Sequence, residues 1–302
     1  MIALRSQNMQ HLVISLIAAL VIPVMGVSIP KMANMKGGGA TFPLQPYSSA
    51  MLDFGQMYMG FQVTPYIESN SVAGQQGVAA GQLNWAGSDV GIRSDLVSKG
   101  LAVLPSIAGG LLITYNIPGI AAPLKLSRKV LPRIFDGKIN TWKDPRILKD
   151  NPFLANYSSQ ARIRVIRQSP TSGATINLHS YLTQLDIENG VVPSPYLNSS
   201  YLQSLNTSLL AKNPAAAVIM IGAIPNTITY LNQFNAKEAI DAPDSTVDSA
   251  WLQHIDGSFI NWSVKSVKAA VDGIPEAIIQ NRSLQTGIDA LNLQLQVLIH
   301  FR

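Results

Sequence analysis

Three short segments that combine glycine with serine or threonine are the residues best suited to chemistry in this chain. They read GGGATFP at residues 37–43, SNSVAG at 69–74 and TSGAT at 171–175, and a helical pattern follows each. Glycine lets a backbone turn tightly, and the first turn of a helix leaves N–H groups without intrahelical partners. Those N–H groups and the helix dipole favour an anion. Taken singly, each segment also fits an ordinary capped helix start, but together they predict a site for a small polyoxyanion.

Other kinds of chemistry find little support in the residues. The chain has no cysteine, which excludes disulfides, cysteine-based metal sites and thiol nucleophiles. Its four histidines are scattered and form no His-x-x-x-His pair, so no metal site is predicted. Gly-x-Ser-x-Gly is absent, and we interpret His179, seven residues after Ser172, as a surface or core histidine. We therefore predict no catalytic residue, no metal and no cofactor, and a protein that is not an enzyme.

Composition predicts a globular protein with a large core. Of the 302 residues, 47% are hydrophobic and only 13% are charged, which indicates two domains or one bilobed fold. The net charge of +5 is spread along the chain without a block of lysine and arginine. Nucleic-acid-binding proteins usually carry such a basic cluster, so we predict no nucleic-acid partner.

The start of the chain has the pattern of a secretory leader. Arg5 precedes the apolar run LVISLIAALVIPVMGV at residues 12–27, which is shorter than a membrane span needs and is interrupted by Pro23. We predict a signal peptide over residues 1–30 and a secreted protein, periplasmic or extracellular. An uncleaved membrane anchor is the alternative.

The elements that would position the three segments alternate between strand and helix. The stretches 61–67, 84–90 and 161–168 are typical of strands, 101–117 of a long strand pair or a crossing segment, and 169–185 of a turn followed by a helix. Strands that alternate with helices predict an α/β fold with mostly parallel sheets. In such sheets a ligand lies beyond the carboxyl ends of the strands, which is where the three segments fall.

Six segments in order carry a resemblance to a known family. They are GGGATFP (37–43), SNSVAGQQGV (69–78), WAGSDV (85–90), LPSIAGGLLITYNIPG (104–119), IFDGKINTWKDPRI (134–147) and VIRQSPTSGATINLHSYL (165–182). Over roughly residues 36–240 the chain resembles the periplasmic phosphate-binding proteins of bacterial ABC phosphate transporters, which have the two-lobed class II periplasmic-binding-protein fold. The resemblance implies a first lobe over 31–109, a second over 110–250, a return to the first over 251–302, and a ligand cleft between the lobes. It also implies a monomer that binds inorganic phosphate and has a membrane ABC permease as a possible partner.

The resemblance carries site residues onto particular positions. Backbone amides, hydroxyls and one cation would surround phosphate, and one carboxylate would accept a hydrogen bond from it. The residues are Thr41, Phe42, Ser71, Asp89, Arg167, Ser172, Gly173 and Ala174. A carboxylate fits phosphate because phosphate near neutral pH keeps a proton to donate, whereas sulfate has none. The plain alternative for Asp89 is a turn or N-cap aspartate.

Three departures from the family pattern bear on function. Gln168 occupies the position of the family arginine and Arg167 lies one residue earlier. Either a bulge in the following Ser-Pro-Thr turn brings Arg167 to the ligand, or the site lacks its cation. Ala174 replaces a threonine and removes a hydroxyl. No closing strand is recognisable in the final LQVLIHFR. A scaffold or interaction protein that kept the fold and lost the ligand is therefore the main alternative, followed by a secreted phosphatase-type enzyme.

Overall fold

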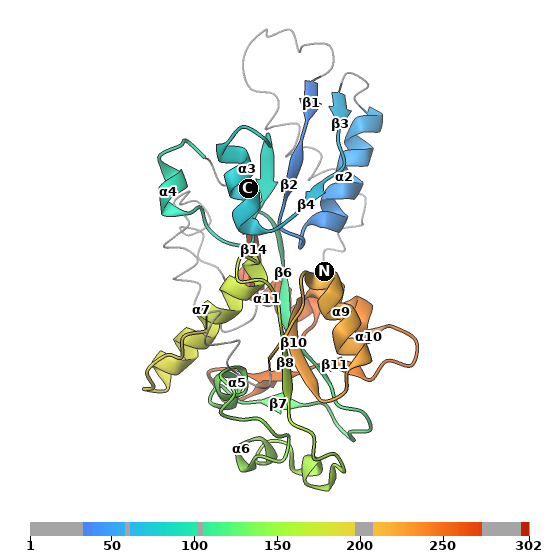
Figure 1. The fold of residues 1–302 in the computed structure, drawn as a ribbon, viewed down its shortest axis with the longest axis vertical. Helices are drawn as coiled ribbons and strands as arrows, with labels where there is room; N and C mark the ends of the chain where they lie inside the picture. Colours follow the sequence, from blue (N-terminus) through green and yellow to red (C-terminus); the bar gives the residue numbers. More distant parts are fainter. Residues whose placement is uncertain (1–32, 58–60, 102–104, 197–207, 274–296, 302) are drawn as a thin grey trace. The chain divides into compact units, whose positions relative to one another are not determined.

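The chain forms two compact units in a computed structural model that describes residues 33–57, 61–101, 105–196, 208–273 and 297–301 (Figure 1). Unit 1 takes the chain as far as Ser88 and then Ile92–Ile107, together with the chain end, and unit 2 takes Asp89–Gly91 and Ala108–Ile299. Each unit combines parallel strands with helices, which confirms the predicted α/β class with two lobes. The predicted leader lies outside the described residues.

Unit 1 is built on a three-stranded parallel sheet in the order β4-β2-β5. A second, two-stranded parallel pair joins β1 to β3. The strand predicted over 61–67 is in fact two strands, because Pro65 lacks the N–H that a continuous ladder requires. The elements are β1 (Ala33–Met35), β2 (Gly37–Gly39), α2 (Leu44–Met57), β3 (Phe61–Val63), β4 (Ile67–Glu68), α3 (Ser71–Ala79), β5 (Trp85–Gly87) and α4 (Ser94–Val97).

The glycines of β2 allow its neighbours to approach closely. Gly39 has φ +117°, a conformation that side chains rarely adopt, and a Cβ on Gly37 would lie 2.1 Å from ring atoms of Trp85. A Cβ on Gly74 of α3 would lie 2.7 Å from the Cα of Gly39. Helix α3 therefore packs directly on the backbone of β2, which explains why Gly39 and Gly74 are both glycine.

Unit 2 contains a larger sheet in the order β11-β6-β10-β8-β9, with β14 also paired to β6. Strand β8 is parallel to β9 and β10, whereas β6 is antiparallel to β10 and β11. Strands β7, β12 and β13 form a separate small sheet. The elements after β6 (Pro105–Asn116) are β7 (Lys125–Leu126), α5 (Val130–Phe135), α6 (Pro145–Leu148), the 3₁₀ helix η1 (Pro152–Asn156), β8 (Arg164–Arg167), α7 (Gly173–Glu188), β9 (Ser208–Leu210), α9 (Pro214–Ala223), β10 (Thr227–Asn232), α10 (Gln233–Ile240), β11 (Val247–Ser249), β12 (Trp251–Gln253), β13 (Phe259–Ile260), α11 (Val264–Asp272) and β14 (Val297–Phe301).

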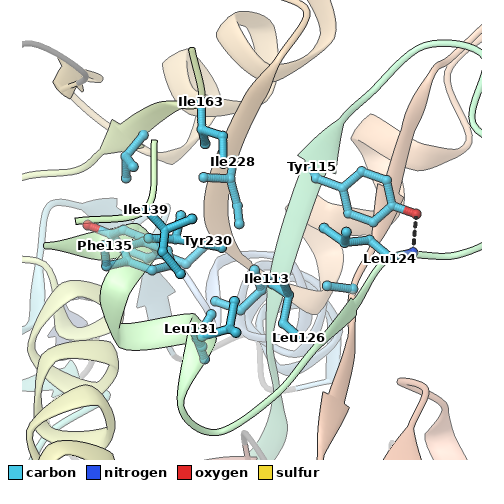
Figure 2. Close-up of a cluster of buried hydrophobic side chains, with 14 of the residues drawn as sticks. Ile113, Tyr115, Leu124, Leu126, Leu131, Phe135, Ile139, Ile163, Ile228 and Tyr230 are labelled. Carbon is cyan, nitrogen blue, oxygen red and sulfur yellow. Dashed lines mark hydrogen bonds between the residues drawn. The ribbon is translucent and has the colours of Figure 1, made fainter. Parts of the chain in front are cut away.

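Helices cover both faces of the large sheet of unit 2. On one face Val165 of β8 packs in a cluster with residues of α5 and α7, and on the other Ile166 packs with residues of α9 and α10. Successive residues of a strand point to opposite faces, so the continuous apolar pattern of β8 reflects burial on both sides. Figure 2 shows the first cluster, in which Phe135 and Tyr230 lie side by side and the Tyr115 hydroxyl accepts a hydrogen bond from the Leu124 amide (3.1 Å).

After residue 250 the described stretch 251–273 belongs to unit 2, whereas the chain end from His300 belongs to unit 1. Strand β12 is parallel to β7, and both belong to unit 2. The final segment, in which no closing strand was recognisable, contributes β14 as a partner of β6. Among the described residues no helix is both long and apolar enough to cross a membrane.

Candidate functional site

In unit 1 the candidate site begins at the carboxyl ends of three parallel strands. Thr41 and Phe42 follow β2, Ser71 opens α3 just after β4, and Ser88 follows β5. Parallel strands end at the same edge of their sheet, and β2, the first of the three in the chain, lies in the centre. The connections reverse direction there, and ligands of open α/β sheets bind outside such a point. Thr41, Phe42 and Ser71 therefore lie at the same edge of the unit 1 sheet.

Hydrogen bonds hold these strand ends in register. The Ala40 amide donates to the Gly87 carbonyl (3.0 Å), and the Ser69 amide donates to the Gly39 carbonyl (2.8 Å). The Tyr66 hydroxyl donates to the Ala40 carbonyl (2.8 Å), one residue before Thr41. The backbone directly before Thr41 and Phe42 is thus attached to both neighbouring strands.

The start of α3 has the geometry that anion sites use. Asn70 is the N-cap, and its side-chain oxygen accepts from the Ala73 amide (2.9 Å). Ser71 is the first helical residue and is completely buried. Its amide belongs to the first turn, whose N–H groups point along the helix axis and carry the positive end of the dipole.

In unit 2 the corresponding feature is the start of α7. Strand β8 ends at Arg167, a turn follows in which the Ser172 amide donates to the Ser169 carbonyl (3.0 Å), and Ser172 is the N-cap of the sixteen-residue helix. Within the described part of the chain the Ser172 hydroxyl caps no amide of α7. Gly173 and Ala174 are the first two helical residues, so their amides point out of the helix start.

Arg167 is buried on the face of the sheet that α5 and α7 cover. Its Nε donates to the Ser208 hydroxyl (2.9 Å), and its Nη2 donates to the Phe135 carbonyl at the end of α5. Strand β8 keeps a regular register with β9 through Arg167, so no bulge lies within the strand. Gln168 is also buried, and its Nε2 donates to the Tyr230 carbonyl (2.6 Å).

His179 is a buried histidine whose pKa is affected by the charge of Arg167. Burial, followed by the positive charge of Arg167, lowers the pKa of His179 to about 3. The imidazole is 2% exposed, and among the described residues its Nδ1 has no hydrogen-bond partner. Of the two roles expected for His179, surface or core, the structure gives the core.

Asp89 is attached to the helix that carries the unit 2 donors. Its backbone carbonyl accepts a hydrogen bond from Nδ2 of Asn177 (2.8 Å), which lies on α7 about one turn beyond Gly173. Sequence reasoning missed Asn177. The sequence held no clear signal, because Asn177 lies about 100° around the helix from the apolar side that carries Leu178 and Leu182, and only its burial shows that its amide needs a partner.

The eight predicted residues thus fall into two groups, each described within its own unit. Unit 1 holds Thr41, Phe42 and Ser71, and unit 2 holds Asp89, Arg167, Ser172, Gly173 and Ala174. The groups supply amide and hydroxyl donors, one guanidinium and one carboxylate. No group of three or more histidine, aspartate and glutamate residues that could hold a metal ion occurs in the parts of the chain that the structure describes.

Relatives of known function share much of this chain. The phosphate-binding protein PstS of Methanocaldococcus jannaschii is 28% identical over 82% of the chain and 64% of its own length. PstS of Pasteurella multocida is 36% identical over 51% of the chain and 44% of its own length. The chain therefore spans about half to two thirds of the length of these curated relatives.

Solved structures confirm the fold. A high-affinity periplasmic phosphate-binding protein, PfluDING, bound with phosphate, has a TM-score of 0.66 at 19% identity and covers 89% of this chain and 79% of its own. The phosphate-binding protein of Stenotrophomonas maltophilia has a TM-score of 0.59 at 20% identity and covers 89% and 78%. At such identities the likeness establishes the fold and nothing finer.

A family profile decides the classification. The profile described as PBP superfamily domain matches residues 28–283, which is most of the chain. The resemblance that the sequence analysis drew from six segments is confirmed by this match and by the curated relatives. The chain belongs to the PBP superfamily.

Proposed function

We propose that this protein is a secreted binding protein for inorganic phosphate. It binds the anion, without changing it chemically, for uptake or scavenging. The observation that carries the proposal is the pair of helix starts, α3 and α7, each placed at the carboxyl end of a parallel strand and each furnished with serine and glycine. The curated relatives named above, which are phosphate-binding proteins, support the same ligand.

The donor set matches the needs of a dehydrated anion. An ion removed from water loses hydration worth far more than any single contact, so many donors must replace it. In the proposal, the amides of Thr41 and Phe42, the hydroxyl and amide of Ser71, and the amides of Gly173 and Ala174 donate to phosphate oxygens. Hydrogen bonds to a charged group contribute about 1.5–3 kcal/mol each.

Asp89 selects the protonated anion in this proposal. An ionised carboxylate accepts hydrogen bonds and donates none, so it stabilises a ligand that still carries a proton. Phosphate near neutral pH carries at least one, and sulfate carries none. Arg167, whose direction is set by its bonds to Ser208 and Phe135, supplies a positive charge.

The setting of the activity belongs to the same proposal. We expect the protein to be exported, to act as a monomer in the periplasm or outside the cell, and to deliver phosphate to a membrane ABC permease. The curated relatives named above are binding proteins, which favours binding over an enzymatic role.

Titration calorimetry with phosphate and with sulfate tests the proposal. We expect heat from phosphate and none from sulfate. Ser71→Ala should weaken phosphate binding by about 10- to 100-fold, because it removes one hydroxyl donor to a charged group. Ser94→Ala, at the first residue of α4, is the matched control and should change nothing.

A ligand-free scaffold is the second candidate, and one observation favours it. Gln168 stands where the family has arginine and is engaged with Tyr230, while two nitrogens of Arg167 are engaged with Ser208 and Phe135. A folded sample that gives no heat with either anion would support the scaffold and refute phosphate binding.

A further inference from the structure

The segment that carries Asp89 is held by two buried side-chain amides. One is Gln75 on α3, and the other is Asn177 on α7. Neither belongs to the donor set described above. Their exposed fractions are 4% for Gln75 and 8% for Asn177.

Gln75 holds the residues on both sides of Asp89. Its Nε2 donates to the Ser88 hydroxyl (2.9 Å), and its Oε1 accepts from the Arg93 amide (3.0 Å). Both bonds lie in unit 1, and together they close the short stretch of chain between Ser88 and Arg93.

Asn177 holds Asp89 itself. Its Nδ2 donates to the Asp89 carbonyl at 2.8 Å, and both residues belong to unit 2. This bond joins residues 88 positions apart in the sequence and fixes the Asp89 backbone on the helix whose first turn holds Gly173 and Ala174. Burying a primary amide costs free energy unless it is hydrogen-bonded. The bond to Asp89 therefore explains why a polar residue is tolerated at this buried position.

We propose that Asn177 is a positioning residue that sets the discrimination between phosphate and sulfate, with Gln75 as the brace of the same segment. The inference rests on the proposed phosphate function. A carboxylate stabilises a protonated ligand oxygen and repels an unprotonated one only while the carboxylate is held at hydrogen-bond distance from the ligand. If the Asp89 backbone is released, the carboxylate can turn away, so phosphate loses a bond and sulfate loses a repulsion.

The experiment compares phosphate and sulfate affinities of the wild-type protein with those of Asn177→Leu and Gln75→Leu. Leucine has a similar size and no donor. In both variants we expect phosphate binding to weaken about tenfold and sulfate binding to stay equal or strengthen, so that the affinity ratio falls by at least about tenfold. Asn177→Gln, which keeps an amide donor, should restore part of the ratio.

Asn189→Leu is the matched control. Asn189 is the C-cap of α7, at the opposite end from the first turn, and its Nδ2 donates to the Leu185 and Arg128 carbonyls. Its loss should therefore lower stability without changing the ratio. If Asn177→Leu does not fold, the smaller Asn177→Ala, which also lacks the donor, takes its place. An unchanged ratio, or an equal weakening for both anions, would overturn the inference while leaving the phosphate function intact. A wild-type protein that binds neither anion would remove the function and the inference together.

Discussion

At the scale of single residues, Asp89 is the one member of the proposed site whose side chain is expected to accept a hydrogen bond from the ligand. Asp89→Asn keeps its size and supplies an N–H donor. We expect this variant to bind sulfate at least about tenfold more tightly than the wild type and phosphate more weakly, because the repulsion between carboxylate and unprotonated oxygen disappears. Competition calorimetry with the two anions measures both effects.

Asp95→Asn provides the control for that substitution. Asp95 lies nearby in the sequence on α4 and pairs with Arg93 at the surface, so its neutralisation changes the net charge equally without touching the proposed site. A sulfate affinity that stays the same in Asp89→Asn as in the wild type would show that Asp89 does not contact the anion.

The surroundings of Arg167 and Gln168 predict which of the two contributes more to phosphate affinity. Arg167→Ala removes a positive charge, so we expect it to weaken phosphate binding by about 10- to 100-fold, more than Gln168→Ala does. Arg167→Lys should not restore affinity, because an ammonium cannot reproduce the fixed bonds of the guanidinium to Ser208 and Phe135. The larger loss for Gln168→Ala would assign the ligand contact to the position of the family arginine.

At the scale of elements, the site depends on how closely α3 lies on β2. The Gly74 Cα faces the Gly39 Cα, and a methyl group at Gly74 would meet it at 2.7 Å. Gly74→Ala should therefore push α3 away, lower the free energy of unfolding by about 1–3 kcal/mol, and weaken phosphate binding because Ser71 moves with the helix. Chemical denaturation and calorimetry on the same sample measure the two losses.

Gly55→Ala is the matched control in α2. A Cβ at Gly55 meets nothing within 4 Å, so alanine should stabilise the helix by roughly 0.5–1 kcal/mol through its better helix propensity. Opposite signs for the two substitutions are the expected result. If Gly74→Ala were as stable as the wild type and bound phosphate equally well, the close packing would not be what positions the start of α3.

Local patterns predicted the elements better than the contacts among them. The turn and helix expected over 169–185 correspond to α7, and the helical pattern expected after 69–74 corresponds to α3, because caps, glycines and apolar spacing act over a few residues. The strand over 161–168 is β8. The single strand expected over 61–67 failed at Pro65, although the missing N–H was visible in the sequence.

Contacts across long sequence separations could not be predicted. The partners of Arg167 lie 41 and 32 residues away, at Ser208 and Phe135. Neither pairing leaves a trace in local composition, since both depend on which strands and helices become neighbours. The direction of the Arg167 side chain is likewise set by the packing of β8 between β9 and β10, which places it on the face that α5 covers.

At the scale of the whole molecule, binding and stability are linked. A ligand that binds only the native state stabilises it by about 2.7 kcal/mol at a hundred times its dissociation constant. We expect saturating phosphate to raise the midpoint of thermal unfolding by several degrees and equal sulfate to leave it nearly unchanged. Matched ionic strength in the two samples separates this effect from general salt effects, and identical midpoints would argue against a phosphate site.

The stability of the protein should also depend on pH through His179. An ordinary histidine has a pKa of 6.5, but burial and the charge of Arg167 lower the pKa of this one to about 3 in the native state. Between those values the unfolded chain binds a proton that the native protein does not, so stability falls as pH falls. Above about pH 6.5 the neutral His179 imidazole costs no stability. As the pH falls from there toward 3, the free energy of unfolding decreases progressively.

His179→Gln removes that proton linkage and isolates it from the carboxylates, which titrate in both proteins. The variant loses packing at all pH values, but the difference in unfolding free energy between variant and wild type should shrink by on the order of 3 kcal/mol from pH 7 to pH 4. Urea denaturation of both proteins at pH 7, 5.5 and 4 measures the difference. Because His179 lies on α7 with Asn177 and the proposed phosphate amides, acid should also destabilise that helix. If the difference in unfolding free energy between variant and wild type does not change with pH, the imidazole is protonated or exposed in the native protein.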